Sequence, residues 1–475
     1  MAQMDEIIAI DIGSTRTKGA LFRVDDNRMK VIDRQEEPTA SEGLEEGFFR
    51  VLEALHNRAA TQPSLVYSSS AKGGLNICAV GIVPQLTLKM AKQTALSAGG
   101  KVTSHFAYKL TTADLKKIET ENPDIILLTG GTDGGNEEYL LHNAALLSQL
   151  SWDGPILFAG NRSVSNKIGE ILQRRELYHC ENILPAIDSP NPGPARQAIR
   201  DIFLQRLCGG KGLNQIVVKS GSAPVPTPSA IFDFLSLPTL RNGSLFGTAG
   251  QNGGFLLFDI GGATSDCYSL GVREEASDRI LKGLPEPDPK RTVEGDLGIR
   301  VSAAATISAA ESDGYLQRVL QLQEDQAEML RVYAQKVSNR PESPPAEEDR
   351  PLAKICLDQA LMRHAGRMRQ AATSTGTVTV QAGKDLSAVS TVIGTGGFLA
   401  RCSQPPQPLS PPLLDRDGWE LLIPGTPEFW QDSDYLWPLL ANAARIHPEA
   451  ACKLAPAVLN RRSSTASNIR SSYGA

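Results

Sequence analysis

The sequence predicts an α/β protein of two related lobes, with a doubly wound parallel α/β domain inserted in the chain. Two stretches, Asp11–Gly19 and Phe258–Asp266, indicate the lobes, because each carries an aspartate, then a glycine, small hydroxyl residues and a second strand-like run. Residues 72–187 indicate the insertion, because continuous apolar strands alternate there with helical segments. At 475 residues the chain is long enough for about two to four domains.

The first stretch is expected to form a β-hairpin with a tight turn. An apolar run leads into Asp11, and another leaves the turn. Gly13 permits close approach of the backbone, and the hydroxyls of Ser14 and Thr15 add hydrogen-bond donors without bulk. We therefore expect this turn to wrap a phosphate, with Asp11 placed to hold Mg²⁺ directly or through water.

The second stretch has the same expected form. Asp259 ends an apolar run, and Gly261, Gly262 and Thr264 would cradle phosphates. A single turn of this kind also fits an ordinary hairpin. Two of them far apart in one chain indicate two lobes that grip one nucleotide from opposite sides, with Asp11 and Asp259 as the metal-organising carboxylates.

A third stretch, Ser390–Leu399, is a buried-looking strand that ends in a glycine turn. Gly394, Gly396 and Gly397 are expected to line the base and ribose of an adenosine. This ordered trio resembles the phosphate-1, phosphate-2 and adenosine motifs of the actin, Hsp70 and sugar-kinase superfamily. The resemblance implies two actin-like (ribonuclease H-like) lobes, with ATP and Mg²⁺ as cofactors.

Two charged residues within the hairpins have two interpretations each. Lys18 could contact the β- and γ-phosphates, or it could be a lysine on a strand surface. Asp266 could orient or activate a water molecule, or it could stabilise the turn. In phosphoryl transfer a protein mainly positions groups and neutralises charge, so these are the side chains that we expect to act in catalysis beside Asp11 and Asp259.

The inserted block carries its own candidate site. The loop Gly130–Gly135 follows an apolar strand, at the edge of an open α/β sheet where ligands usually bind. An ordinary glycine-rich βα turn is the alternative. Asn161 and Arg162 end the next strand and could face the same crevice.

The chain therefore divides into five predicted parts. We expect the helices over 353–372 and 435–444 to belong to the second lobe, which the later one can close. The parts are a first actin-like lobe (1–70), the inserted domain (71–187), a connector with return helices (188–250), a second actin-like lobe (251–460) and a disordered tail (461–475).

Composition excludes several classes of protein. The formal net charge is −5 and aromatic residues make up 5%, so neither a cationic surface nor base-stacking platforms for nucleic acid are expected. Asp5 and Glu6 interrupt any apolar leader, so we expect no signal peptide. No run is long enough to cross a bilayer, and the cysteines lack metal-ligand spacing. We expect a cytoplasmic protein.

Longer phrases carry a closer resemblance. Ile10–Lys18, Leu128–Asn136, Leu257–Asp266, Val293–Gly298 and Val392–Gly397 together resemble the accessory protein family associated with methylaspartate (glutamate) mutase, called MutL or GlmL. The resemblance implies an actin-like ATPase that acts as a chaperone or reactivase, with the subunits of an adenosylcobalamin-dependent mutase as its partners.

Two other functions suit the same fold. A small-molecule kinase or other ATP-dependent metabolic enzyme would need an acidic base near the γ-phosphate, and Asp133 is the residue that could be recruited. A nucleotide-sensing scaffold would bind ATP without hydrolysing it.

Overall fold

The structure, a computed structural model, divides the chain into two compact units. The first joins residues 1–73 to residues 230–475, and the second comprises residues 74–229. The second unit thus runs beyond residue 187, where the inserted domain was predicted to end. The residues that the structure describes are 4–39, 43–70, 75–207, 213–241, 254–272, 279–341, 343, 346–374 and 376–462.

The first lobe is a sheet in which three antiparallel strands are followed by a strand parallel to the first. Within the first unit the strand order is β4-β1-β2-β3. Helix α1 covers one face of the sheet. It packs so closely on β2 that a Cβ on Gly19 would lie 2.5 Å from Val51 of the helix. The elements are β1 (Asp5–Ile12), β2 (Arg16–Asp25), β3 (Arg28–Pro38), α1 (Leu44–His56) and β4 (Ser64–Ser69).

The second lobe repeats this plan. Its strand order is β14-β12-β11-β17-β19-β20, with β12 antiparallel to its neighbours β11 and β14, and β17 parallel to β11. Strands β14, β12, β11 and β17 thus match β3, β2, β1 and β4, which confirms the predicted pair of actin-like lobes. The strands are β11 (Phe255–Ile260), β12 (Ser265–Leu270), β14 (Lys290–Glu294), β17 (Thr391–Thr395), β19 (Glu428–Gln431) and β20 (Asn460–Arg462). The helices α8 (Thr227–Leu235) and α9 (Pro238–Arg241) precede them in the chain.

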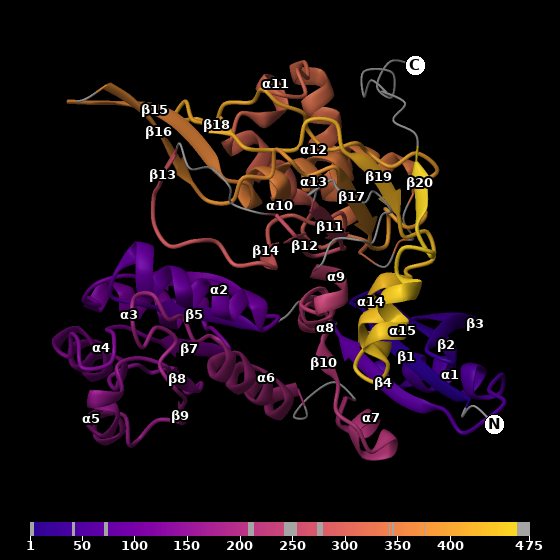
Figure 1. The fold of residues 1–475 in the computed structure, drawn as a ribbon, viewed down its shortest axis with the longest axis horizontal. Coiled ribbons are helices and arrows are strands. Elements are labelled where there is room, and N and C mark those ends of the chain that lie inside the picture. Colours follow the sequence, from indigo (N-terminus) through magenta and orange to yellow (C-terminus); the bar gives the residue numbers. More distant parts are fainter. Residues whose placement is uncertain are drawn as a thin grey trace. The chain divides into compact units, whose positions relative to one another are not determined.

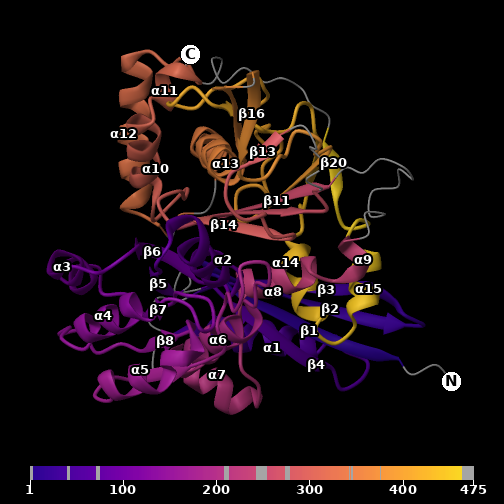
Figure 2. The ribbon, with the colours of Figure 1, turned by 60° about the vertical axis from the view of Figure 1, so that its left-hand side comes forward.

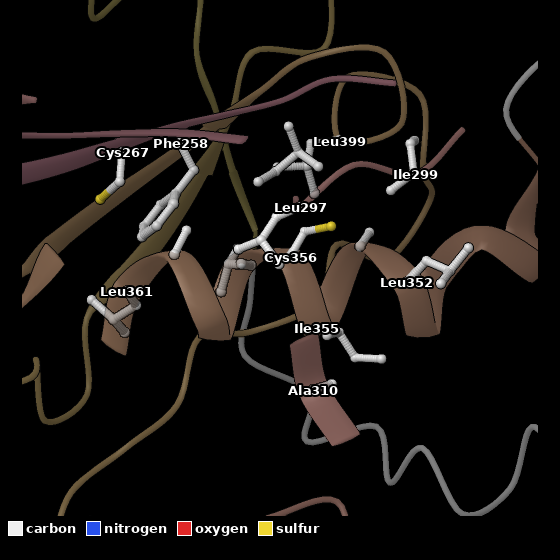
Figure 3. Packing of buried hydrophobic residues seen from close by; sticks show 14 of the residues in the cluster. Phe258, Cys267, Leu297, Ile299, Ala310, Leu352, Ile355, Cys356, Leu361 and Leu399 are labelled. Carbon is white, nitrogen blue, oxygen red and sulfur yellow. The ribbon is translucent and has the colours of Figure 1, made fainter. Parts of the chain in front are cut away.

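Helix α13 forms the centre of the second lobe's core and is buried almost all round. Figure 3 shows the sheet residue Phe258 on one side of this helix, and Ile355 on the other side toward Ala310 of α10. A helix that is apolar on several faces is typical of a core position. Residues 303–338 comprise three helices. The elements are α10 (Ala303–Ser312), α11 (Tyr315–Arg318), α12 (Glu324–Ser338), η3 (Glu347–Asp349) and α13 (Arg350–His364).

The prediction of a helix over 353–372 is wrong for the second half of that segment. After α13 the chain turns into β15, which pairs with β16 in a sheet ordered β13-β16-β15-β18. The guanidinium carbons of Arg367 and Arg369 lie 5.4 and 4.4 Å from the ring centroid of Trp419, so stacking holds this strand. The strands are β13 (Arg279–Leu281), β15 (Arg367–Thr373), β16 (Gly376–Ala382) and β18 (Glu420–Leu421).

The last helices complete the first lobe, not the second as predicted. Helix α14 (Leu436–Ala443) packs against β1, β2 and β4, and α15 (Pro448–Leu454) packs against β3. Figures 1 and 2 both show these yellow helices beside the indigo strands. The Asn442 amide donates a hydrogen bond to Ser68 Oγ (2.7 Å), on the sheet face opposite α1. Helices from late in the sequence therefore cover the sheet that the first strands form.

The predicted tail is partly ordered. Residues 460–462 form β20, which pairs with β19, so the first residues of the segment expected to be disordered lie in a sheet. The rest of that segment, 463–475, lies outside the described residues.

The second unit is a parallel sheet ordered β6-β5-β7-β8-β9, which confirms the doubly wound inserted domain. Apolar residues on its strands and helices form one core cluster. The elements are β5 (Asn76–Val80), η1 (Pro84–Leu88), α2 (Lys89–Ser97), β6 (Lys101–Phe106), α3 (Thr112–Glu121), β7 (Ile125–Leu128), α4 (Glu138–Leu147), β8 (Ile156–Phe158), η2 (Arg162–Val164), α5 (Ser165–Ile171), β9 (Leu177–His179), α6 (Gly193–Leu207), α7 (Leu213–Ser220) and β10 (Val225–Pro226).

Candidate functional site

The two predicted phosphate turns close with the same hydrogen bond. The amide of Gly13 donates to the Arg16 carbonyl at 3.1 Å, and the amide of Gly261 donates to the Thr264 carbonyl at 2.9 Å. A Cβ on Gly13 would lie 2.7 Å from the Arg16 carbonyl oxygen, so this turn requires glycine. The side chains of Ser14 and Thr15 at the tip of the first turn are exposed.

The strand register gives both aspartates equivalent positions. Asp11 lies opposite Lys18 across β1 and β2, and Asp259 lies opposite Asp266 across β11 and β12. On the parallel side Asp11 adjoins Ser68, just as Asp259 adjoins a threonine of β17. Each lobe thus presents its carboxylate beside a hydroxyl.

Asp11 is held by two hydroxyl groups. Ser68 Oγ donates to its Oδ1 at 2.9 Å, and the Tyr435 hydroxyl donates to its Oδ2 at 3.0 Å. The Asp11 side chain is buried, so these bonds fix the direction of its carboxylate. The sequence had indicated neither donor, since both are ordinary residues far from the glycine motifs.

The pKa of Asp259 depends on charged groups of both lobes. Its pKa is raised to about 7, first by burial and then by the charge of Asp266, with Asp11 and Asp432 acting in the same direction and Lys18 opposing them. The charges of Asp11 and Lys18 in the first hairpin therefore act on the Asp259 carboxyl of the second.

Lys18 carries the positive charge of this site. Burial lowers its pKa, although Asp11, Glu36 and Asp259 raise it. Its ammonium nitrogen lies 3.2 Å from the ring centroid of Tyr435, which is a cation–π contact. The alternative of a lysine on a solvated strand surface does not describe this position.

Asp266 lies in a buried ion pair. Its Oδ1 accepts from Arg291 Nε at 2.8 Å and lies 2.6 Å from Nη2. Burial raises the pKa of Asp266, while Arg291 lowers it. This arrangement favours a structural role for Asp266 over the activation of water.

The second phosphate turn is braced from behind by residues 295–302. Its carbonyl groups accept from the amides of Ile299 and Arg300 and from Ser302 Oγ. Within the part of the chain that the structure describes, the amides of Gly262, Ala263 and Thr264 donate to no protein group. These three donors suit an anion such as a phosphate.

The three glycines of the third motif have different surroundings. Gly396 has a φ of +104°, and a Cβ there would lie 2.3 Å from the Ile260 carbonyl oxygen and 2.9 Å from Asp259 Oδ1. This turn therefore rests directly on the second phosphate strand. At Gly394 a Cβ would lie 2.6 Å from the Phe429 ring, so packing alone requires that glycine, and Gly397 is half-buried.

The candidate site of the inserted unit is a firmly tied loop. Asn161 Oδ1 accepts from the Gly134 amide, and its Nδ2 donates to the Gly135 carbonyl. Asn182 donates to the Gly131 carbonyl and to Asp133 Oδ1. Asn161 therefore lies beside this loop, as predicted. These hydrogen bonds hold the loop in place, which gives Asn161 and Asn182 a structural role.

The residues fit a nucleotide with Mg²⁺. Among the described residues, no three His, Cys, Asp or Glu side chains come together to hold a metal by themselves. A cation between Asp11 and Asp259 would then take its other ligands from water and phosphate, as Mg²⁺ usually does. The described helices also include none that is long and apolar enough to cross a membrane.

Two matched lobes, each with a carboxylate hairpin in the same register, define a protein of the actin-like ATPase fold. The chain belongs to the MutL protein family, whose sequence pattern matches residues 7–459. It is 34% identical over 462 residues to Protein MutL of Clostridium tetanomorphum, covering 95% of this chain and 98% of that relative.

Solved structures of other proteins align with the chain at low TM-scores. Gluconate kinase from Lactobacillus acidophilus has a TM-score of 0.31 and 9% identity, and the alignment covers 97% of this chain and 93% of that one. A Ppx/GppA family member from Aquifex aeolicus has a TM-score of 0.22 and 9% identity, covering 82% and 66%.

Proposed function

We propose that the protein is a Mg²⁺-dependent ATPase that serves as an accessory or reactivating chaperone of an adenosylcobalamin-dependent mutase of the glutamate mutase type. The observation that carries the ATPase half is the matched register of Asp11 and Asp259, each at the end of a strand that leads into a glycine turn closed by the same hydrogen bond. Membership of the MutL family supports the mutase half.

Each residue of the site would have a separate task. Asp11 and Asp259 would hold Mg²⁺, and the amides of Gly262, Ala263 and Thr264 would bind phosphate oxygens. The Lys18 ammonium would neutralise further charge on the phosphates. Bound Mg-ATP would supply the phosphoanhydride bond whose hydrolysis drives the cycle.

The link to a partner would be closure of the lobes. Arg401 of the second lobe pairs with Glu36 of the first, near the hairpins. Lobes that close on ATP and reopen after hydrolysis can shift a partner between two states, by their difference in affinity for those states. Release of a damaged cobalamin from a mutase is the partner change that the family resemblance suggests.

A direct experiment measures phosphate release from ATP with and without Mg²⁺, and with and without a purified glutamate mutase that carries an inactivated cobalamin. We expect slow Mg²⁺-dependent hydrolysis that the inactivated mutase stimulates, together with recovery of mutase activity. Hydrolysis that depends on an added metabolite would instead support a kinase. Binding of ATP without turnover, with or without mutase, would support a nucleotide-sensing scaffold.

A further inference from the structure

Tyr435 lies between two charges that would otherwise meet. Asp11 and Lys18 are cross-strand partners of opposite charge, and such pairs normally attract. Within the described residues, however, no carboxylate lies within 4.0 Å of the Lys18 ammonium. The Tyr435 hydroxyl bonds to Asp11 Oδ2 while the face of its ring holds the ammonium.

The backbone fixes Tyr435 in this place. Its φ of +54° lies in the left-handed region, which is unusual for a bulky residue and persists only where neighbours enforce it. Asp432 enforces it, because its carboxylate accepts from the amides of Leu436 and Trp437 and from Thr395 Oγ1 at 2.7–2.9 Å. The ring is thereby aimed at the first hairpin from the start of α14.

We propose that Tyr435 is a positioning residue that keeps the Asp11 carboxylate and the Lys18 ammonium from pairing with each other. Its hydroxyl holds the carboxylate that would bind the cation, and its ring holds the ammonium that would bind a phosphate. Kept apart from each other in this way, the carboxylate would bind Mg²⁺ and the ammonium a phosphate. This inference rests on the proposed nucleotide-binding function.

The two halves of the side chain can be removed one at a time. Tyr435→Phe loses the hydroxyl and keeps the ring, whereas Tyr435→Leu loses both. Calorimetry with ADP measures affinity at several Mg²⁺ concentrations and in the absence of Mg²⁺. Tyr108→Phe is the matched control, because Tyr108 is an exposed tyrosine that also has a positive φ.

For Tyr435→Phe we expect a rise of about tenfold in the Mg²⁺ concentration that gives half of the Mg²⁺-dependent increase in ADP affinity. This is the effect expected from the loss of one hydrogen bond to a charged group. The affinity for ADP without Mg²⁺ should not change. For Tyr435→Leu both should weaken by about tenfold or more. A Phe variant like the wild type, or a Leu variant no worse than Phe, would overturn the proposal.

A second readout needs no nucleotide. In protein with ¹³C-methylated lysines, the Lys18 NMR signal should show an upfield ring-current shift that Tyr435→Phe keeps and Tyr435→Leu removes. A ring-current shift of Lys18 that survives in Tyr435→Leu would contradict the positioning role, whereas wild-type protein that binds no Mg-nucleotide would refute only the proposed function.

Discussion

Lys18 and Asp266 hold the same register position in the two hairpins, and they carry opposite charges. Lys18 lies opposite Asp11, which gives the first hairpin a positive and a negative group. Asp266 lies opposite Asp259, which gives the second hairpin two carboxyl groups. Burial first, and then the charge of Asp266, raise the pKa of Asp259. The two repeated hairpins therefore carry different charges at equivalent positions.

The carboxylates can be tested by replacement with amides of the same shape. Asp11→Asn and Asp259→Asn should each weaken Mg²⁺-dependent nucleotide binding by about a hundredfold, because they remove the charge that attracts the cation. Calorimetry with Mg-ADP gives the affinities, and circular dichroism checks the fold. Asp153→Asn, at a highly exposed position of the inserted unit, is the control. Wild-type affinity in both site variants would contradict the metal role.

Asp259 should also make stability depend on pH. Its pKa is about 7 in the folded chain, against an ordinary value of 3.8, so the folded state keeps a proton that the unfolded state loses. Without Mg²⁺, this contribution is full below pH 3.8 and is lost as pH rises through about 7. Asp259→Asn should therefore stabilise the protein at pH 8, by on the order of a few kcal/mol, and change little at pH 4. Urea unfolding at both values measures this, and equal effects at both would contradict it.

We expect His364 to make stability depend on pH in the opposite direction. Burial holds its pKa well below 6.5, and Lys290 and Lys384 add to this. Its ring nitrogens contact Thr292 Oγ1 at 2.8 Å and Ser269 Oγ at 2.9 Å, so the neutral ring is satisfied. Stability is complete above pH 6.5 and should fall as pH decreases below it, because only the unfolded state gains the proton.

Thermal unfolding from pH 7.5 to 5 measures this fall in the wild type and in His364→Gln. The fall should be smaller in the variant. His56→Gln, at an exposed position on α1, should keep the wild-type slope. The same slope in all three proteins would show that another group is responsible.

Gly396 should tolerate no side chain. A Cβ there would approach the Ile260 carbonyl oxygen at 2.3 Å in addition to the positive φ. Gly418 also has a positive φ, of +74°, but a Cβ there would meet nothing within 4 Å. Urea unfolding should show a loss of about 1 kcal/mol for Gly418→Ala and of about 3 kcal/mol or more for Gly396→Ala. Equal losses would exclude the clash.

Local signals made much of this fold predictable. An aspartate, a glycine and small residues between two apolar runs define each hairpin within about ten residues, and a turn of that kind depends on its own chain. The inserted unit was predictable for the same reason, since alternation of apolar strands with helices extends over the whole block. Register then followed from the turns, which placed Asp11 and Asp259 alike.

Long-range contacts decided the features that the sequence did not reveal. The strand from Arg367 has a composition that favours a helix, yet pairing with β16 and stacking on Trp419 override it. Tyr435 reaches Asp11 from the far end of the chain and belongs to no glycine motif. Nothing local separates such a tyrosine from any other helix-start residue.

The packing of α14 and α15 on the first sheet has a consequence during synthesis. Until residues 436–454 leave the ribosome, the face of β1, β2 and β4 that carries Asp11 and Ser68 has no cover from these helices. The N-terminal lobe therefore stays incomplete while most of the second lobe is being translated. A nascent chain of this protein should therefore complete the candidate site late, once residues 436–454 have been translated.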